Sequence, residues 1–246
     1  MRLLTYNIRR GGLGREEALL ATMSSCSPDI VVLQEATDPD VVKRLASGMA
    51  MAHCGAMPKY SLGFMSRMRM AHVEWHRPRV SRHAFLELAP AGMDFRIFGV
   101  HLSAVFAAIT ERRRVFELRA LLRSIKHHQR GFHALAGDFN TVAPGELLDV
   151  SALPRRVRAA MWVSGGRVRW RTIQIVLNAG YVDAFRARHP ADPGLTLPAA
   201  RPQVRLDYVF VPSAYGQRIE SCDVIGSEPA RSASDHLPLL ATLDVS

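Results

Sequence analysis

The stretch "FHALAGDFN", residues 132–140, runs from apolar residues into Asp138 and Asn140. In an extended strand alternate side chains share a face, so Ala134, Ala136 and Asp138 point the same way, with the carboxylate at the strand's exit. A buried carboxylate without a partner is strongly destabilising or becomes protonated. Asp138 therefore needs a cation or strong hydrogen-bond donors close to it.

Polar side chains end or interrupt other apolar runs in the same way. Glu35 ends "DIVVLQE" on the face of Val31 and Leu33. Asp207 shares a face with Val209 in "RLDYVFV" because alternate residues of a strand point the same way. Four more residues belong to this set: Asn7, His101, Asp235 and His236. Together they are more than a core usually tolerates, which indicates a site where several strands end.

Each of these residues alone has an ordinary explanation, because an acid after a strand often caps a turn or helix and a single buried histidine is usually hydrogen-bonded. As a set these residues indicate a site with a chemical function. Oxygen ligands from Glu, Asp and Asn suit a hard cation such as Mg²⁺ or Mn²⁺. Histidines that are not needed as ligands are then free to contact a phosphate or to transfer protons.

The remaining pattern predicts strands interspersed with helices. We expect strands at 2–8, 29–35, 61–66, 83–89, 94–103, 132–140, 204–211, 222–226 and 238–245, and helices at 16–23, 39–46, 105–128 and 170–177. This order favours an α/β (α+β) fold with a mixed sheet or a pair of sheets and flanking helices. No repeat or linker is evident, so the sequence predicts a single domain over residues 1–246.

The longest predicted helix has one apolar stripe, because four residues recur at spacings of three and four. They are Val115, Leu118, Leu122 and Ile125. Four arginines fall largely off this stripe: Arg112, Arg113, Arg119 and Arg123. We expect the stripe to lie on a sheet and the arginines to face outward.

Positive charge dominates the composition, with a formal net charge of +10 over 246 residues, and only Lys43, Lys59 and Lys126 are lysines. Such a surface suits a polyanion such as nucleic acid or anionic lipid. The alternative is an arginine-rich composition spread over a solvated surface. Arg155 and Arg156 lie in a basic segment, residues 153–171, that is either a substrate-facing element or a solvated loop with tryptophans tucked into the core.

No run reaches the ~18 to 20 apolar residues of a membrane span, and the start "MRLLTYNIRRGG" is unlike a signal peptide. Cys26, Cys54 and Cys222 are far apart and lack CxxC spacing, so neither a disulfide framework nor a zinc site is indicated. We expect a cytoplasmic monomer with reduced thiols.

The ordered set "TYNI", "VLQE", "GVHLS", "GDFN", "RLDYVF" and "SDHLP" resembles the endonuclease/exonuclease/phosphatase superfamily of metal-dependent phosphoesterases. The motifs cover nearly the whole chain in the family's order. The resemblance implies a DNase I-like four-layer sandwich: two packed, mostly antiparallel sheets with helices outside and the site at one end. It also implies Mg²⁺ or Mn²⁺ as the cofactor.

By this resemblance Glu35 is the principal metal ligand, with Asn7 and Asp235 in or near the coordination sphere. Asp138 positions or deprotonates the attacking water, and Asn140 holds the water and a phosphate oxygen.

The resemblance further implies that His236, oriented by Asp207, stabilises the transition state or acts as acid or base, and that His101 contacts the phosphate from the other side. Arg67 matches a frequent family segment and is expected to face the cleft. Thr196 precedes "RLDYVF" as in the family and is expected near the substrate, but Leu197 stands where an aromatic residue usually follows.

The predicted function is hydrolysis of phosphodiester bonds, with DNA or RNA as the expected substrate in view of the charge. One alternative is a phosphodiesterase or phosphatase for a small-molecule or lipid phosphoester, because a fold resemblance does not fix the leaving group. A catalytically inactive nucleic-acid-binding protein is the third reading, and the presence of all eight expected site residues argues against it.

Overall fold

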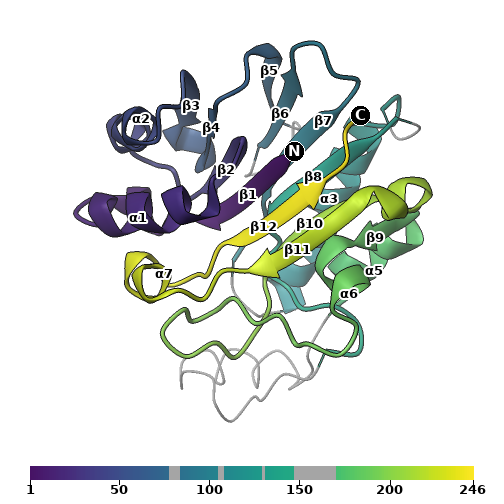
Figure 1. Ribbon diagram of the computed structural model, residues 1–246. Coiled ribbons are helices and arrows are strands. Elements are labelled where there is room, and N and C mark those ends of the chain that lie inside the picture. The colour runs from purple at the N-terminus through teal and green to yellow at the C-terminus, as the bar shows by residue number, and fades with distance from the viewer. Residues whose placement is uncertain (78–83, 105–107, 129–130, 147–169) are drawn as a thin grey trace.

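Two six-stranded β-sheets pack face to face in the computed structural model, which describes residues 1–77, 84–104, 108–128, 131–146 and 170–246 (Figure 1). The first sheet contains β1 (Arg2–Asn7), β2 (Ile30–Gln34), β3 (His53–Met57), β4 (Leu62–Ser66), β11 (Ile219–Val224) and β12 (Leu239–Leu243). The second contains β5 (Met70–His76), β6 (Phe85–Pro90), β7 (Arg96–His101), β8 (His133–Asp138), β9 (Tyr181–Asp183) and β10 (Asp207–Pro212).

The strand order is β11-β12-β1-β2-β4-β3 in the first sheet and β5-β6-β7-β8-β10-β9 in the second. In each sheet one central pair is parallel, β1 with β2 and β7 with β8, and the other neighbours are antiparallel. The predicted pair of mixed, mostly antiparallel sheets is therefore confirmed.

The alternation of side chains along the strands builds separate cores on the two faces of each sheet. In β8, Ala134 and Ala136 belong to the apolar cluster between the sheets, whereas Leu135 belongs to the cluster under the helices of the second sheet. Both faces of β8 are buried. Asp138 continues the face of Ala134 and Ala136, so its carboxylate points between the two sheets.

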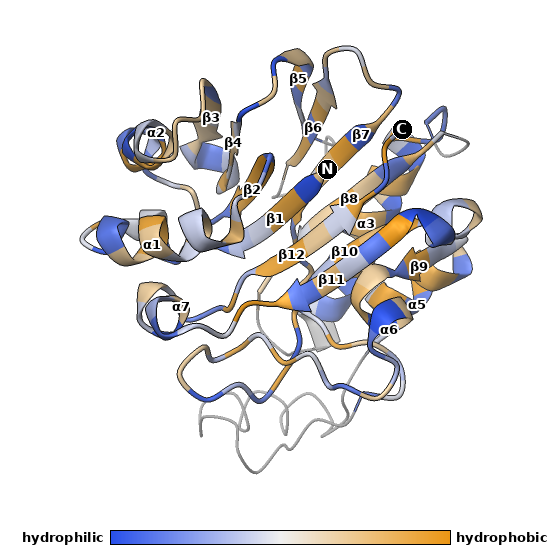
Figure 2. Ribbon diagram, in the orientation of Figure 1, coloured by the Kyte–Doolittle hydropathy of each residue, from blue (hydrophilic) through white to orange (hydrophobic). Residues whose placement is uncertain are grey.

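Helices cover the outer face of each sheet, which completes four layers. Residues of α1 (Glu16–Cys26), α2 (Pro39–Gly48) and α7 (Glu228–Ala233) pack on the first sheet, and residues of α3 (Ala108–Ser124) and α5 (Arg171–Asn178) on the second. The short α6 (Ala184–Arg188) follows β9. Figure 2 shows hydrophobic and hydrophilic residues side by side on the helices, as expected for elements with one face on a sheet.

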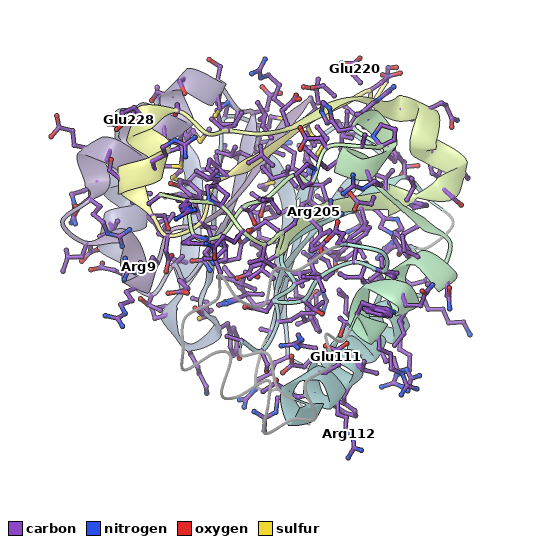
Figure 3. The ribbon with its side chains drawn as sticks, turned by 90° about the horizontal axis from the view of Figure 1, so that it is seen from below. Arg9, Glu111, Arg112, Arg205, Glu220 and Glu228 are labelled. Atoms are coloured by element: carbon purple, nitrogen blue, oxygen red, sulfur yellow. The ribbon has the colours of Figure 1, made fainter. Side chains whose placement is uncertain are left out.

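The apolar stripe of α3 is buried as predicted at Val115, Leu118 and Ile125, and Arg112 is exposed (Figure 3). Leu122, however, is only half-buried, and Leu121 lies in the core instead. The helix spans Ala108–Ser124; residues 125–128 of the predicted range form a turn, and residues 105–107 lie outside the described residues. Among the described residues no helix is long and apolar enough to cross a membrane.

Three strands and two short helices were not expected from the sequence: β3, β5, β9, α6 and α7. β3, "HCGAM", is half-exposed and contains a glycine, and β5, "MAHVEWH", carries histidine and glutamate on an edge of its sheet. β9 has only three residues. These three strands cannot be recognised by a continuous apolar run or by their length. Pairing with neighbouring strands decides that they are extended.

Gly137 explains why a glycine precedes Asp138. A Cβ atom built on Gly137 would lie 1.8 Å from the carbonyl oxygen of Val100 on the neighbouring strand β7, and Gly137 has a φ of 155°. The obstacle is backbone, which cannot move aside as a flexible side chain would. Only glycine allows β7 and β8 to approach this closely beside Asp138.

We predict that Gly137→Ala lowers the free energy of unfolding by ~3 kcal/mol or more, because the added methyl group overlaps the backbone of β7. Urea unfolding followed by circular dichroism measures the change. The matched control is Gly216→Ala, whose Cβ would meet only a Val182 methyl group at 3.5 Å, with an expected change within ~0.5 kcal/mol. Equal effects of the two substitutions would contradict the steric explanation.

Candidate active site

Strand register brings three of the predicted residues together at one end of the second sheet. Asp138 pairs with His101 on the parallel strand β7 and with Asp207 on the antiparallel strand β10. All three side chains are buried, with exposed fractions of 7% for His101 and 1% for each aspartate. The two acids and the imidazole thus come from three adjacent strands.

Asn7 connects these residues to the first sheet. Its Nδ2 donates to Oδ2 of Asp138 at 3.1 Å and to Oε1 of Glu35 at 3.3 Å. Its Oδ1 accepts a hydrogen bond from the backbone N–H of Arg9 at 3.0 Å. The amide therefore fixes the two carboxylates relative to each other, in addition to any contact of its oxygen with a metal.

Glu35 reaches the site because the chain leaves β2 in a left-handed conformation. Strand alternation alone would place Glu35 on the face of Val31 and Leu33, as predicted from the sequence, and in the structure those two residues lie on the helix-covered face. Glu35 instead has a φ of 55°, a conformation uncommon outside glycine that marks a local constraint. Its Oε2 accepts from the backbone N–H of Arg10 at 2.7 Å.

His236 lies between two buried carboxylates. Its Nδ1 is 2.9 Å from Oδ2 of Asp207, and its Nε2 is 3.8 Å from Oδ2 of Asp138. Burial by itself lowers the pKa of His236, but the charges of Asp207 and Asp138 outweigh it and raise the pKa to about 10. His236 is therefore an imidazolium at neutral pH and offsets the charge of its neighbours.

Asp138 is held by donors on both of its oxygens. Oδ2 accepts from Asn7, and Oδ1 accepts from the backbone N–H of Asn140 at 2.8 Å. Burial raises the pKa of Asp138, His236 lowers it, and the charge of Asp207 raises it further. The net result is a carboxyl group with a raised pKa, more basic than an ordinary aspartate.

Asn140 turns the chain away from β8 with a φ of 52°, and its Nδ2 donates to the carbonyl oxygen of Leu102 at 3.0 Å. The same residue thus orients Asp138 through its backbone and holds the segment after His101 through its side chain.

Asp235 lies beside the turn that follows β1. Its Oδ2 is 3.4 Å from Nε of Arg9, and both side chains are partly exposed. Arg9 and Arg10 both have left-handed backbone conformations, with φ of 50° and 48°. Because Arg10 donates to Glu35 and Arg9 pairs with Asp235, this turn lies between the two acids predicted as metal ligands.

Two residues that the sequence did not single out join the end of β1 to the loop carrying His236. Ser234 donates its hydroxyl to the carbonyl oxygen of Asn7 at 2.6 Å. Arg15 donates to the carbonyl oxygens of Ile8, at 3.0 Å, and of Arg9 and Ala233. Nothing in the sequence pattern distinguishes Arg15 from the many surface arginines.

A buried network on α3 supports the segments after β7 and β8. Glu117 accepts from the N–H of Ser103 at 3.1 Å and from its hydroxyl at 2.9 Å, and Arg114 donates to the carbonyl oxygen of Ser103 at 2.8 Å. Glu111 pairs with Arg114 and accepts from the hydroxyl of Thr141 at 3.4 Å. The sequence contained a sign of this network, because the charged residues Glu111 and Arg114 occupy helix positions in line with the apolar stripe of α3.

Thr196 is fully buried, in place of the expected position near the substrate. Its Oγ1 accepts from the N–H of Leu206 at 3.1 Å, and its carbonyl oxygen accepts from the N–H of Leu237 at 2.8 Å. These partners are the neighbours of Asp207 and His236. Arg205, buried in the middle of the molecule (Figure 3), also supports this region, with its guanidinium 4.5 Å from the ring centroid of Tyr208.

The structure does not bring Arg67 to this site. Arg67 follows β4, and the register of β4 on β2 pairs Ser66 with Ile30, at the opposite end of β2 from Glu35. Its Nε donates to the carbonyl oxygen of Pro28 at 3.2 Å. The expectation that Arg67 faces the cleft is corrected by this register. Arg155 and Arg156 lie outside the described residues.

The donor set fits a hard divalent cation. Glu35 and Asp235 are partly exposed carboxylates, of which Glu35 accepts from the amide of Asn7 and Asp235 pairs with Arg9. Deeper in the site, Asp138, Asp207 and His236 place possible ligand atoms within 4.8 Å of one another. Among the described residues nothing donates to Oδ1 of Asp207, although this atom is buried. Oxygen-rich sites of this kind suit Mg²⁺ or Mn²⁺.

Many solved structures are similar to this one, and three of them illustrate the likeness. An AP endonuclease from Archaeoglobus fulgidus matches with a TM-score of 0.78 at 18% identity, with 100% of each chain covered. NExo, a 3′ phosphatase from Neisseria bound to a product DNA hairpin, matches with 0.76 at 20% identity over 99% of each chain. Humanized TDP2 of D. rerio matches with 0.68 at 20%, covering 99% of this chain and 98% of that one. At these identities the likeness shows a shared DNase I-like fold.

No curated protein matches the sequence significantly. The family profile described as Endonuclease/Exonuclease/phosphatase family matches residues 4–236, which include every residue of the site from Asn7 to His236. The predicted resemblance is thereby confirmed, and this chain belongs to the Endonuclease/Exonuclease/phosphatase family.

Proposed function

We propose that this chain is a divalent-metal-dependent hydrolase of phosphodiester bonds in nucleic acid. The observation that carries the proposal is the convergence of Asn7, Asp138, Asp207 and His236 from both sheets on one buried point, with Glu35 at its mouth. Family membership supports phosphoesterase chemistry.

Glu35 would hold the metal, with Asn7 and Asp235 beside it. A bound Mg²⁺ or Mn²⁺ supplies Lewis-acid stabilisation of the charge on phosphoryl oxygens. Asn7 keeps the carboxylate of Glu35 at a fixed separation from that of Asp138 through its two hydrogen bonds. This amide therefore links the metal-binding end of the site to the end that handles protons.

Asp138 is the group we assign to the attacking water. A general base works best when its pKa approaches the operating pH, and burial raises the pKa of Asp138. Its Oδ1 is fixed by the N–H of Asn140, and the side chain of Asn140, partly exposed at the strand end, lies where it could hold the water or a phosphate oxygen.

His236 is the group we assign to transition-state charge. Asp207 fixes its ring through Nδ1, which leaves Nε2 as the donor toward a phosphoryl oxygen. Fixed donors aimed at developing charge usually supply ~10²- to 10³-fold in rate each. His101, which neighbours Asp138 on β7, would contact the phosphate from the opposite side.

Nucleic acid is the proposed substrate for two reasons. The chain carries a net charge of +10, which favours association with a polyanion. Two structures of the same fold are an AP endonuclease and a 3′ phosphatase bound to a DNA hairpin. A small-molecule or lipid phosphoester is the alternative substrate class, because a shared fold leaves the leaving group open.

The first test is a substrate panel with metal control. We expect Mg²⁺ or Mn²⁺ to support cleavage of plasmid, abasic-site DNA or RNA, and EDTA to abolish it. Glu35→Gln should lower the cleavage rate by ~10²-fold or more, because it removes the charge that holds the metal. Gel assays of product formation measure both.

The matched control for this test is Glu220→Gln, an exposed glutamate at the edge of the molecule (Figure 3), which should leave the rate unchanged. Hydrolysis confined to phosphomonoesters or phospholipids would select the alternative substrate class. The proposal would be refuted if the protein hydrolysed no phosphoester in a metal-dependent way, or if the Glu35→Gln variant kept full activity.

The second test compares two histidine–aspartate pairs. His236→Gln should lower kcat by ~10²- to 10³-fold, because it removes the imidazolium that offsets charge in the transition state. His189 pairs with Asp223 at 3.0 Å but is about one-third exposed, so His189→Gln should leave kcat unchanged. Steady-state kinetics on the preferred substrate measures kcat for both variants, and circular dichroism verifies that they are folded. Equal kcat values for the two variants would refute the role of His236.

A further inference from the structure

A second group of histidine and glutamate side chains lies at the β5 edge of the second sheet. Strand β5 carries His72, Glu74 and His76 at alternate positions, so the three side chains share one face. Glu74 pairs with Glu87 on β6, which places Glu87 on the same face. We call these four residues the histidine–glutamate cluster.

The distances within the histidine–glutamate cluster are those of groups that can share one cation. Nε2 of His72 is 3.1 Å from Oε2 of Glu74, and Nδ1 of His76 is 3.5 Å from Oε1 of Glu74. Ligand atoms of His72, Glu74 and Glu87 all lie within 4.8 Å of one another. A tetrahedral zinc site with bonds of ~2.0 to 2.1 Å separates its ligand atoms by ~3.4 Å, which is similar to these distances.

The cluster is separate from the proposed catalytic site. Glu87 contacts the guanidinium of Arg96 at the start of β7, whereas His101 lies at the end of that strand. Five residues of strand span ~17 Å. Among the described residues, the hydrogen bonds and ion pairs of Glu35, Asp235 and His236 do not reach the cluster. The proposed reaction uses none of the cluster's residues.

Glu87 and Glu74 differ in burial and in the basic groups that surround them. Glu87 is 4% exposed and has Arg96 as its ion-pair partner, while His76 lies 2.6 Å from its Oε2 and His128 lies 3.7 Å from its Oε1. Glu74, by contrast, is half-exposed and has only His72 and His76 as ion-pair partners among the described residues.

We propose that His72, Glu74, His76 and Glu87 form a binding site for a first-row transition-metal dication of the zinc type. Two imidazoles and two carboxylates are donors that zinc accepts, whereas Mg²⁺ prefers oxygen and water. The two carboxylates offset the charge of the ion, and Glu87 also keeps Arg96 as an ion-pair partner. The ion would fasten the edge strand β5 to β6.

The test is metal binding by the full chain, stripped with EDTA, dialysed and then held in millimolar Mg²⁺ so that the catalytic site is supplied with its proposed cation. Zn²⁺ alone is titrated calorimetrically, and Co²⁺ is added in parallel because its visible absorption reports tetrahedral coordination. We expect the wild-type chain to bind one more equivalent than a His72→Ala, His76→Ala double variant. At this site the double variant should lose more than ~100-fold in affinity, since loss of outer-sphere partners alone costs ~10- to 100-fold.

A His53→Ala, His189→Ala double variant, which removes two partly exposed imidazoles elsewhere, is the matched control and should bind as the wild type does. Glu74→Gln is a second, milder variant and should weaken binding while the chain stays folded. Zn²⁺ should raise the Tm of the wild type and not that of the cluster variants. The proposal is overturned if the wild type binds no more zinc than the cluster variant, or if the control variant loses the same equivalent.

Discussion

The carboxylate of Asp138, buried between two sheets, is the constraint on which the rest of the site depends. Such a charge is tolerated only if donors and an opposite charge surround it. Asn7 supplies a donor from the first sheet, the N–H of Asn140 supplies another, and the imidazolium of His236 supplies the charge. Each of these groups is fixed in turn by a strand end or a buried hydrogen bond, so the sheets, the loops and the site stabilise one arrangement together.

Much of this arrangement follows from strand periodicity. Alternation correctly places Asp138 and Asp207 on the face between the sheets, because Ala134, Ala136 and Val209 lie in the core there. Glu35 shows where the rule ends. Its side chain reaches Asn7 only because the backbone turns left-handed after β2, and no pattern of side chains announces a turn at a glutamate. The edge strands β3 and β5 were not predicted for a related reason. Their extended structure depends on neighbouring strands in the sheet rather than on the hydropathy of their own residues.

Residues that position others were harder to predict than residues that carry charge into the core. Thr196 was expected near the substrate, yet it holds the backbone next to Asp207 and His236. Arg67 was expected in the cleft, but the antiparallel register of β4 carries it to the far end of β2. Glu111, Arg114 and Glu117 hold the segments after β7 and β8 from inside α3. Their roles depend on which loop a helix meets, which is a property of the assembled layers.

The hydrogen bond from Ser234 to the carbonyl oxygen of Asn7 joins residues 227 positions apart. Strand β1 lies between β2 and β12 in the first sheet, so the position of β1 is completed only when the last strand has paired with it. A chain emerging from the ribosome as far as β10 would already contain Asp138 and Asp207 but not the imidazolium that lies between them. Contacts of such long sequence separation are late and slow to form. The arrangement around Asp138 therefore depends on residues synthesised after β10, and a truncated or nascent chain that lacks them would hold its acids without the imidazolium of His236.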